Sequence, residues 1–351
     1  MKTFQNISLI IFLLLAATVL NGCSIAGTQS SPDGGVFISY NFGDTWEQKA
    51  FVNNEGASIA SVGTNFIRFD PADENIVYLI TYGAGIYKST NAGNQWTPTG
   101  LAGGTYNSMS IDSRNNDVLY VTEGIFIRKS VDGGITWKDI YQETRPSQSI
   151  VAILVDPFSP NIVYAATTSG LIKSFDYGNT WELLDWSTTQ ILQLHISTKN
   201  RNVLYAFTNL GPTKGISKSS DGGSTWTALE KNLESFDRGQ KIRWLDFDPQ
   251  TENIILGTEG GIVRSFDGAN TWEVVPTLFD FQKIPITTVI QNPNNYNEII
   301  FSVNNLLQKS DDRGKTWEVL KTVQTLRTIN YLANDPYREN VVFLGTVPLP
   351  Q

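Results

Sequence analysis

The sequence predicts an all-β fold, a seven-bladed β-propeller of four-stranded antiparallel blades. Three observations lead to this prediction. A segment of eight residues that begins with serine and ends with tryptophan occurs seven times, and a second signal built on aspartate and proline recurs between its copies. The two ends of the chain also each supply half of one unit. Self-similarity with a period of roughly 40–50 residues is typical of repeat folds, and four short strands per period indicate a propeller.

The repeated segments, which we call repeat turns, are represented by Ser130–Trp137, with the sequence SVDGGITW. The tryptophans that close them lie 50, 41, 44, 45, 46 and 45 residues apart. Aspartate or asparagine accepts backbone hydrogen bonds two residues on, and glycine supplies a positive φ, so each segment predicts a tight turn between two strands. Ala269 replaces the second glycine of one turn, where a positive φ would strain the backbone. The seven turns begin at Ser39, Ser89, Ser130, Ser174, Ser219, Ser265 and Ser310.

Aspartate-rich turns also occur in calcium-binding loops. Each repeat turn lacks the further carboxylates that a Ca²⁺ site with roughly six to eight oxygen ligands requires. We therefore expect no metal site and no cofactor.

The second signal predicts the remaining strands. In Asp70–Tyr78, an Asp-Pro pair that initiates a turn is followed by a Val/Ile/Tyr run typical of a strand. Counterparts begin at Asp112, Asp156, Ser197, Asp248, Asn292 and Asp335. One unit therefore reads as four strands, A to D in chain order. In the first complete unit we expect strand A over 66–69, strand B over 76–80, strand C over 86–89, and strand D from Gln95 onward.

The ends of the chain predict how the ring closes. The N-terminal part supplies only strands C and D, beginning at Val36–Ser39. The C-terminal part supplies only strands A and B, over 332–334 and 341–344. The last blade is therefore predicted to take two strands from each terminus, and the propeller is predicted to span 34–351.

The pattern S-x-D-x-G-x-T-W resembles the Asp-box, or bacterial neuraminidase, repeat. This repeat occurs in sialidases, sortilin-type receptors, two-propeller xyloglucanases and photosystem II assembly-factor propellers. The resemblance implies the propeller fold. In all these families the motif is a structural turn, so it implies no particular function.

The N-terminus predicts a targeting segment over residues 1–22. A positive start at Lys2 precedes an apolar run too short for a comfortable membrane span. Leu20–Cys23 then resembles a bacterial lipobox, which implies that lipid is attached to Cys23, the one cysteine of the chain. The alternative is a buried free thiol. Residues 23–33 are small and polar and read as a flexible tether. We expect a lipoprotein held outside the cytoplasm, at the periplasm or cell surface, with the membrane as one partner.

The charge pattern argues against a nucleic-acid partner and shows one basic position that recurs in most units. The formal net charge of −8 argues against nucleic acid, because phosphate binding needs a basic face. The residue before the repeat-turn serine is basic in six units: Lys88, Lys129, Lys173, Lys218, Arg264 and Lys309. These residues form either a ring that attracts anionic lipid headgroups or, as we favour, a set of stems packed along the repeat-turn tryptophans.

Strand direction separates two ends of the ring. The A–B loops and repeat turns share one end, the turn face; the B–C and D–A loops share the other, the loop face. The loop face is more irregular, so we expect a protein or peptide partner there. Its D–A loops mix aromatic and basic residues, which suit protein interfaces. The candidates are Arg145, Trp186, Arg238, Lys241, Phe281 and Lys283. The alternative is that the aromatic residues only pin the loops to the ring.

The innermost strands supply a second set of candidates. Arg68, His195 and Asp246 occupy the same position, two residues before the Asp-Pro signal, and are predicted to line the central channel at one level. A hydrogen-bonded channel group explains them without catalysis.

The choice between enzyme and binding module depends on missing motifs. Sialidases carry an Arg-Ile-Pro motif near the start, and the nearest string here, Ile67–Pro71, does not match it. Xyloglucanases place two carboxylates between two propellers, and this chain has one propeller. We therefore assign no catalytic residue. The prediction is a non-catalytic binding or assembly module, with a glycoside hydrolase or exo-sialidase-like enzyme as the alternative.

Overall fold

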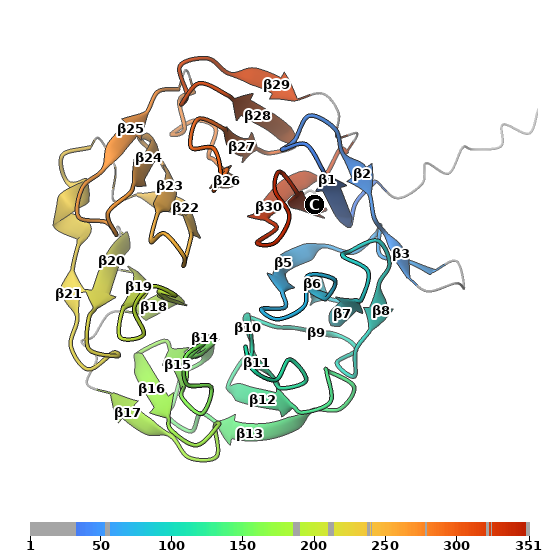
Figure 1. Cartoon of the computed structure of the whole chain (residues 1–351), viewed down its shortest axis with the longest axis vertical. Coiled ribbons are helices and arrows are strands. Elements are labelled where there is room, and N and C mark those ends of the chain that lie inside the picture. The colour runs from blue at the N-terminus through green and yellow to red at the C-terminus, as the bar shows by residue number, and fades with distance from the viewer. Residues whose placement is uncertain are drawn as a thin grey trace, which may run out of the picture. The chain divides into compact units, whose positions relative to one another are not determined.

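A computed structural model of the chain shows the predicted seven-bladed propeller (Figure 1). The structure describes residues 33–52, 57–184, 190–209, 214–236, 239, 241–277, 279–320, 323 and 325–348. The predicted targeting segment and Cys23 lie outside these residues. No helix in the described ranges is long and apolar enough to cross a membrane.

Blade 1 is built from both ends of the chain, as predicted. Its sheet has the order β2-β1-β31-β30, with β30 (Thr328–Asn334) innermost, then β31 (Val342–Val347), β1 (Val36–Ser39) and β2 (Glu47–Gln48). Strand β1 pairs antiparallel with β31, placing Ile38 opposite Phe343. The C-terminal strands therefore complete the first blade and close the ring.

Blades 2 to 7 follow along the chain, each with strands A to D from the centre outward. Blade 2 contains β5 (Thr64–Phe69), β6 (Val77–Gly83), β7 (Ile86–Ser89) and β8 (Thr97–Pro98), close to the predicted bounds; β9 (Gly104–Thr105) also pairs with β6. Blade 3 contains β10 (Ser108–Ile111), β11 (Leu119–Glu123), β12 (Phe126–Ser130) and β13 (Lys138–Gln142), and blade 4 contains β14 (Ile150–Val155), β15 (Val163–Thr167), β16 (Gly170–Ser174) and β17 (Glu182–Leu184). Blade 5 contains β18 (Gln190–Ile196), β19 (Leu204–Asn209), β20 (Lys214–Ser219) and β21 (Thr227–Ala228), and blade 6 contains β22 (Ile242–Phe247), β23 (Ile254–Thr258), β24 (Gly261–Ser265) and β25 (Glu273–Val275). Blade 7 contains β26 (Thr288–Gln291), β27 (Ile299–Val303), β28 (Leu306–Ser310) and β29 (Glu318–Leu320).

The core lies between the blades. Buried apolar side chains of the described residues gather in clusters, each shared by two neighbouring blades. Between blades 1 and 2, for example, Ile38 and Phe343 pack with Ile67 and Trp96. Burial of these faces is the main favourable term in the stability of the ring.

The repeat turns hold themselves together by side-chain hydrogen bonds. In Ser130–Trp137, the Ser130 hydroxyl donates to Asp132 Oδ1 at 2.7 Å and accepts the Gly134 N–H at 2.9 Å. Asp132 also accepts the Thr136 N–H at 2.9 Å, and the Thr136 side-chain hydrogen bond lowers the pKa of Asp132 to about 2. The serine-to-Asp/Asn and backbone-to-serine bonds recur in the other six turns. Ala269 has a φ of 69°, so it takes the strained conformation expected from the sequence.

A short hairpin explains the longest spacing between repeat-turn tryptophans. Strands β3 (Phe51–Val52) and β4 (Ala57–Ser58) form it between blades 1 and 2. Trp96 packs beneath the hairpin with none of its surface exposed, and its indole N–H donates to the Lys49 carbonyl at 2.8 Å. The sequence did not predict this hairpin.

The prediction that the basic residues pack along the tryptophans was wrong. Lys88 lies over the ring of Tyr78, its partner on the neighbouring strand of the same blade, and its ammonium donates to the Gly133 carbonyl at 3.3 Å. Gly133 belongs to the repeat turn of the next blade. Lys129 and Lys173 repeat this arrangement over Tyr120 and Tyr164. The lysines therefore link neighbouring blades, and each ammonium lies over the face of a buried tyrosine ring.

Candidate functional site

The loop face contains Arg145, which is held by an ion pair. It lies in the loop between β13 and β14, and its guanidinium contacts the carboxylate of Glu143 at 2.7 Å. The Glu143 side chain is 1% exposed, and hydrogen bonding from Arg145 lowers its pKa. Arg145 Nη2 also donates to Thr167 Oγ1 at 3.3 Å. This arginine compensates a buried charge and orders its loop.

Phe281 pins its loop to the ring. Only 2% of its surface is exposed, and its ring meets Phe301 edge-on at 5.5 Å. It also stacks near Phe279 at 6.0 Å. A partner that approaches this face would therefore not contact the ring of Phe281 in this conformation, because apolar packing against blade 7 covers it.

The remaining predicted residues of this face differ in their placement. Trp186 and Arg238 lie outside the described residues. Lys241 is half-buried, and its carbonyl accepts the Glu259 N–H at 3.0 Å. The Lys283 side chain is 82% exposed and lies 3.3 Å from Asp280. Of the basic candidates described on this face, Lys283 presents its charge most openly.

Two leucines that the sequence did not indicate as candidates are more exposed than Phe281. Leu326 is 77% exposed in the loop before β30, and Leu306 is 48% exposed at the start of β28. Their loops are joined, because Asn305 Nδ2 donates to the Thr325 carbonyl at 3.4 Å and the Ile329 N–H donates to the Asn304 carbonyl at 2.8 Å. Ile284 is 43% exposed in the loop between β25 and β26, and Tyr82 is 51% exposed near the end of β6.

The predicted channel residues lie on three innermost strands. Arg68 is on β5, His195 on β18 and Asp246 on β22. Arg68 Nε donates to the Met109 carbonyl at 3.1 Å, and the His195 ring packs at 5.0 Å from Phe247. His195 Nε2 lies 3.2 Å from Gln193 Oε1 of the same strand.

Two aromatic residues meet across the centre of the ring. Trp244 on β22 packs edge-on against Tyr331 on β30 with 5.7 Å between the ring centroids, although blade 7 separates their blades. Tyr331 also donates from its hydroxyl to the Ile67 carbonyl of blade 2 at 3.3 Å. These contacts bring the side chains of Trp244 in blade 6 and Tyr331 in blade 1 together and join Tyr331 to the backbone of blade 2. The spacing of the repeats gave no signal for them.

Burial shifts the acid–base properties of this central group. It lowers the pKa of His195 to about 3, with a further contribution from the Arg68 charge. Burial also raises the pKa of Asp246 to about 7, with a further contribution from the Asp248 carboxylate. His195 is therefore neutral near pH 7, and Asp246 keeps its proton to a higher pH than an ordinary aspartate does. Within the described part of the chain, no cluster of three or more potential metal ligands occurs.

Asp246→Asn is expected to change how stability depends on pH. An acid whose pKa is raised by folding contributes stability that is complete below its unfolded pKa, near 3.8, and is lost as the pH rises to about 7. The variant lacks this loss, so its melting temperature relative to wild type should rise between pH 5 and pH 8. A difference in melting temperature that stays constant over this range would show that Asp246 ionises normally.

Comparison with known proteins identifies the fold. Neither a protein-family model nor a curated protein sequence matches the chain. The solved structure of YCF48 from Cyanidioschyzon merolae is 15% identical with a TM-score of 0.61, and the match covers 81% of this chain and 95% of that one. A structure described as YCF48 bound to D1 peptide is 14% identical with a TM-score of 0.60, covering 82% and 94%.

Enzymes share the same architecture. The GH74 enzyme of Niastella koreensis is 19% identical with a TM-score of 0.62, and the match covers 81% of this chain but only 50% of the enzyme. This chain therefore spans about half the length of that enzyme. At these identities the likenesses show the fold alone. They confirm that this chain shares its fold with the assembly-factor and xyloglucanase propellers.

Proposed function

We propose that this chain is a lipid-anchored, extracytoplasmic propeller that binds a polypeptide partner through its loop face and does not catalyse a reaction. The observation that carries the proposal is the exposure of Leu326 and Leu306 on two loops that are hydrogen-bonded to each other. Exposed apolar side chains on ordered loops suit protein recognition, because binding buries them without a large cost in loop entropy.

The structural neighbours support a peptide as the partner. The match covers 94% of a YCF48 chain whose structure is described as bound to a D1 peptide. A protein with this fold therefore binds a peptide. Because the two chains are 14% identical, a peptide partner for this chain is part of the proposal.

The double variant Leu306→Asp/Leu326→Asp is expected to lose its partner. Two carboxylates on the contact surface would have to be desolvated on binding, so recovery of the partner from detergent-solubilised membranes should fall at least tenfold. Ile135→Asp is the matched control, because Ile135 is 73% exposed but lies in a repeat turn on the turn face. Equal recovery by the double variant and wild type, or equal loss in the control, would contradict a leucine-based site.

Cys23→Ala is expected to release the protein from the membrane. The proposed anchor rests on the lipobox-like sequence before Cys23, and stable attachment through acyl chains requires that thiol. Wild-type protein should incorporate labelled palmitate and sediment with membranes, whereas the variant should do neither. Wild-type protein that incorporates no labelled palmitate would exclude the anchor and leave the loop-face proposal intact.

Glycoside hydrolysis is the second candidate function. It is favoured by the likeness to GH74 propellers and by the pKa of about 7 at Asp246, a value suited to a general acid. One of these neighbours is described as a xyloglucanase, so xyloglucan is the first substrate to test. Hydrolysis by wild type that disappears in Asp246→Asn would establish this function in place of the binding module.

A further inference from the structure

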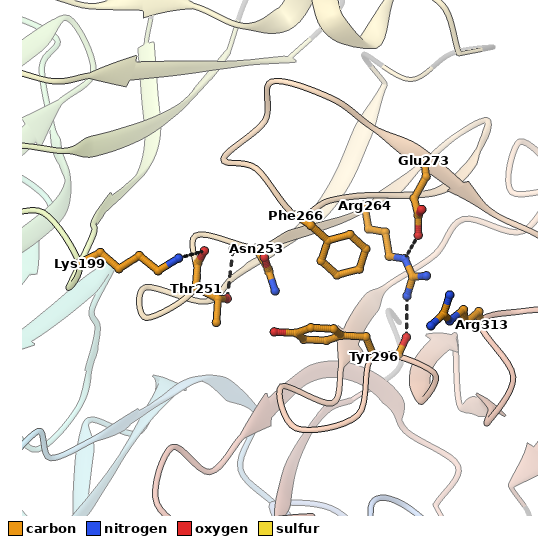
Figure 2. Close-up of a pocket in the computed structure, with 8 residues that line it drawn as sticks. All are labelled: Lys199, Thr251, Asn253, Arg264, Phe266, Glu273, Tyr296 and Arg313. Atoms are coloured by element: carbon orange, nitrogen blue, oxygen red, sulfur yellow. Dashed lines mark hydrogen bonds and ion pairs between the residues drawn. The ribbon is translucent and has the colours of Figure 1, made fainter.

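A pocket of about 440 Å³ lies at the junction of blades 6 and 7, on the turn face (Figure 2). The residues that line it come from the A–B loops of blades 5, 6 and 7, the repeat turns of blades 6 and 7, and strands β24 and β25, which carry Arg264 and Glu273. They are Lys199, Thr251, Asn253, Arg264, Phe266, Glu273, Tyr296 and Arg313. The proposed polypeptide site lies on the opposite face, so the pocket is a separate feature of the molecule.

The pocket occurs where the repeat departs from its pattern. In blades 2 to 5, strand B carries a tyrosine opposite the basic residue of strand C, as at Tyr164 and Lys173. That tyrosine ring fills the space beside the next repeat turn; the hydroxyl of Tyr164, for example, donates to the Gly222 carbonyl at 3.1 Å. In blade 6 the tyrosine is replaced by Ile255, which pairs with Arg264, and in blade 7 by Ile300, which pairs with Lys309. The shorter side chain cannot reach the next turn, so the junction is more open.

The pocket concentrates positive charge on an acidic protein. Lys199, Arg264 and Arg313 line it, against the single carboxylate of Glu273 among its described lining residues. Glu273 pairs with Arg264 at 2.5 Å. Lys199 and Arg313 hydrogen-bond only to neutral oxygens among the described residues, the Thr251 carbonyl at 2.8 Å and Asn297 Oδ1 at 2.7 Å. These two cations therefore keep a charge that an anionic ligand can neutralise.

The pocket also offers neutral polar groups and an aromatic wall. The Asn253 side-chain amide and the Tyr296 hydroxyl form no hydrogen bond with any residue in the described ranges. Phe266 and Tyr296 pack at 5.1 Å, and Phe266 remains 41% exposed. Figure 2 shows Lys199 at one side of this wall and Arg313 at the other, with Asn253 between them. Apolar walls with a few placed polar groups are typical of small-ligand sites.

We propose that this pocket binds a carboxylate-bearing sugar, one or two units of an acidic polysaccharide. Arg313 and Lys199 would hold carboxylates, and Arg313 has two Nη groups free of described partners for a bidentate contact. Asn253 and Tyr296 would hydrogen-bond ring hydroxyls, and the apolar face of the sugar would pack against Phe266. An acidic peptide side chain would use the cations but leave the amide and the phenol without a partner, so it fits less well.

Calorimetric titration of the propeller with digalacturonate tests this proposal. We expect binding that weakens with added salt, and a loss of at least tenfold in affinity for Arg313→Gln, because a charge-assisted contact is removed. Tyr296→Phe removes only the hydroxyl and should weaken binding less. Arg114→Gln is the matched control, an exposed arginine on an A–B loop of blade 3, and should bind as wild type does.

Ile255→Tyr provides an independent test by introducing the tyrosine that blades 2 to 5 carry at this position. The new ring should occupy the space beside Arg313 and abolish digalacturonate binding; circular dichroism and a melting curve establish that the variant is folded. Three results would overturn the proposal: no binding of digalacturonate to wild type, equal binding by Arg313→Gln, or binding of cellobiose or succinate as tight as that of digalacturonate. Tight succinate binding would indicate a simple anion site. An acidic peptide that binds more tightly would assign the pocket to a polypeptide instead.

Discussion

Replacement of Trp96 with alanine is expected to lower the free energy of unfolding by about 3–5 kcal/mol, the range for loss of a buried large aromatic residue. Trp96 has no exposed surface and packs with side chains of blades 1 and 2 beneath the β3–β4 hairpin. Its indole N–H also donates to the Lys49 carbonyl. The variant therefore loses apolar contacts and leaves the carbonyl of the half-buried Lys49 without this donor. Urea denaturation followed by circular dichroism measures the effect.

Trp181→Ala is the matched control for this prediction. Trp181 closes a repeat turn in the same way, but it is half-buried and its indole N–H bonds within its own turn, to the Gly178 carbonyl at 3.1 Å. Its removal should cost about half as much, in proportion to the smaller apolar area that it buries. An equal loss in the free energy of unfolding at the two positions would mean that packing beneath the hairpin does not increase the stabilising effect of Trp96.

Deletion of residues 328–351 is expected to abolish cooperative folding. It removes β30 and β31, and with them Phe343 and Leu344, neither of which has exposed surface. Losses of about 2–5 kcal/mol for each such side chain are comparable with a total stability of roughly 5–15 kcal/mol. Strand β1 would also lose its partner, and blade 2 would lose one of its packed neighbours.

Deletion of residues 349–351 is the control for ring closure, because these residues follow the last strand. This shorter deletion should unfold in the same single transition as wild type. A cooperative transition in the longer deletion, at a denaturant concentration near that of wild type, would show that the ring does not depend on the C-terminal strands.

The fold was predictable because each blade repeats the same local chemistry. Seven repeat turns and seven copies of the Asp-Pro signal, counting the weaker ones, defined the blades, and the halves at the two termini defined the closure. What differs between blades was harder to predict. The β3–β4 hairpin appeared in the sequence only as five extra residues before Trp96, and its two short strands carry no distinctive pattern.

The candidate sites depended on side-chain direction, which the repeat did not specify. Phe281 and Leu326 both lie in D–A loops, yet one packs against Phe301 and the other faces solvent. Lys88 was assigned to the wrong aromatic residue because Tyr78 becomes its neighbour only through strand pairing. The pocket at blades 6 and 7 lies beside Ile255, one of two isoleucines that replace the strand-B tyrosine of blades 2 to 5, and finding this position required the register of strands B and C.

The most direct measurement of the proposed function is photo-crosslinking in intact membranes. A photoreactive residue would be introduced at position 326, on the loop face, and in a second protein at position 135, on the turn face; both native side chains are more than 70% exposed. We expect a discrete crosslinked polypeptide from position 326 that is absent from position 135 and is lost when Leu306 is changed to aspartate. Crosslinking from position 135 alone, or equally from both positions, would contradict a polypeptide site on the loop face.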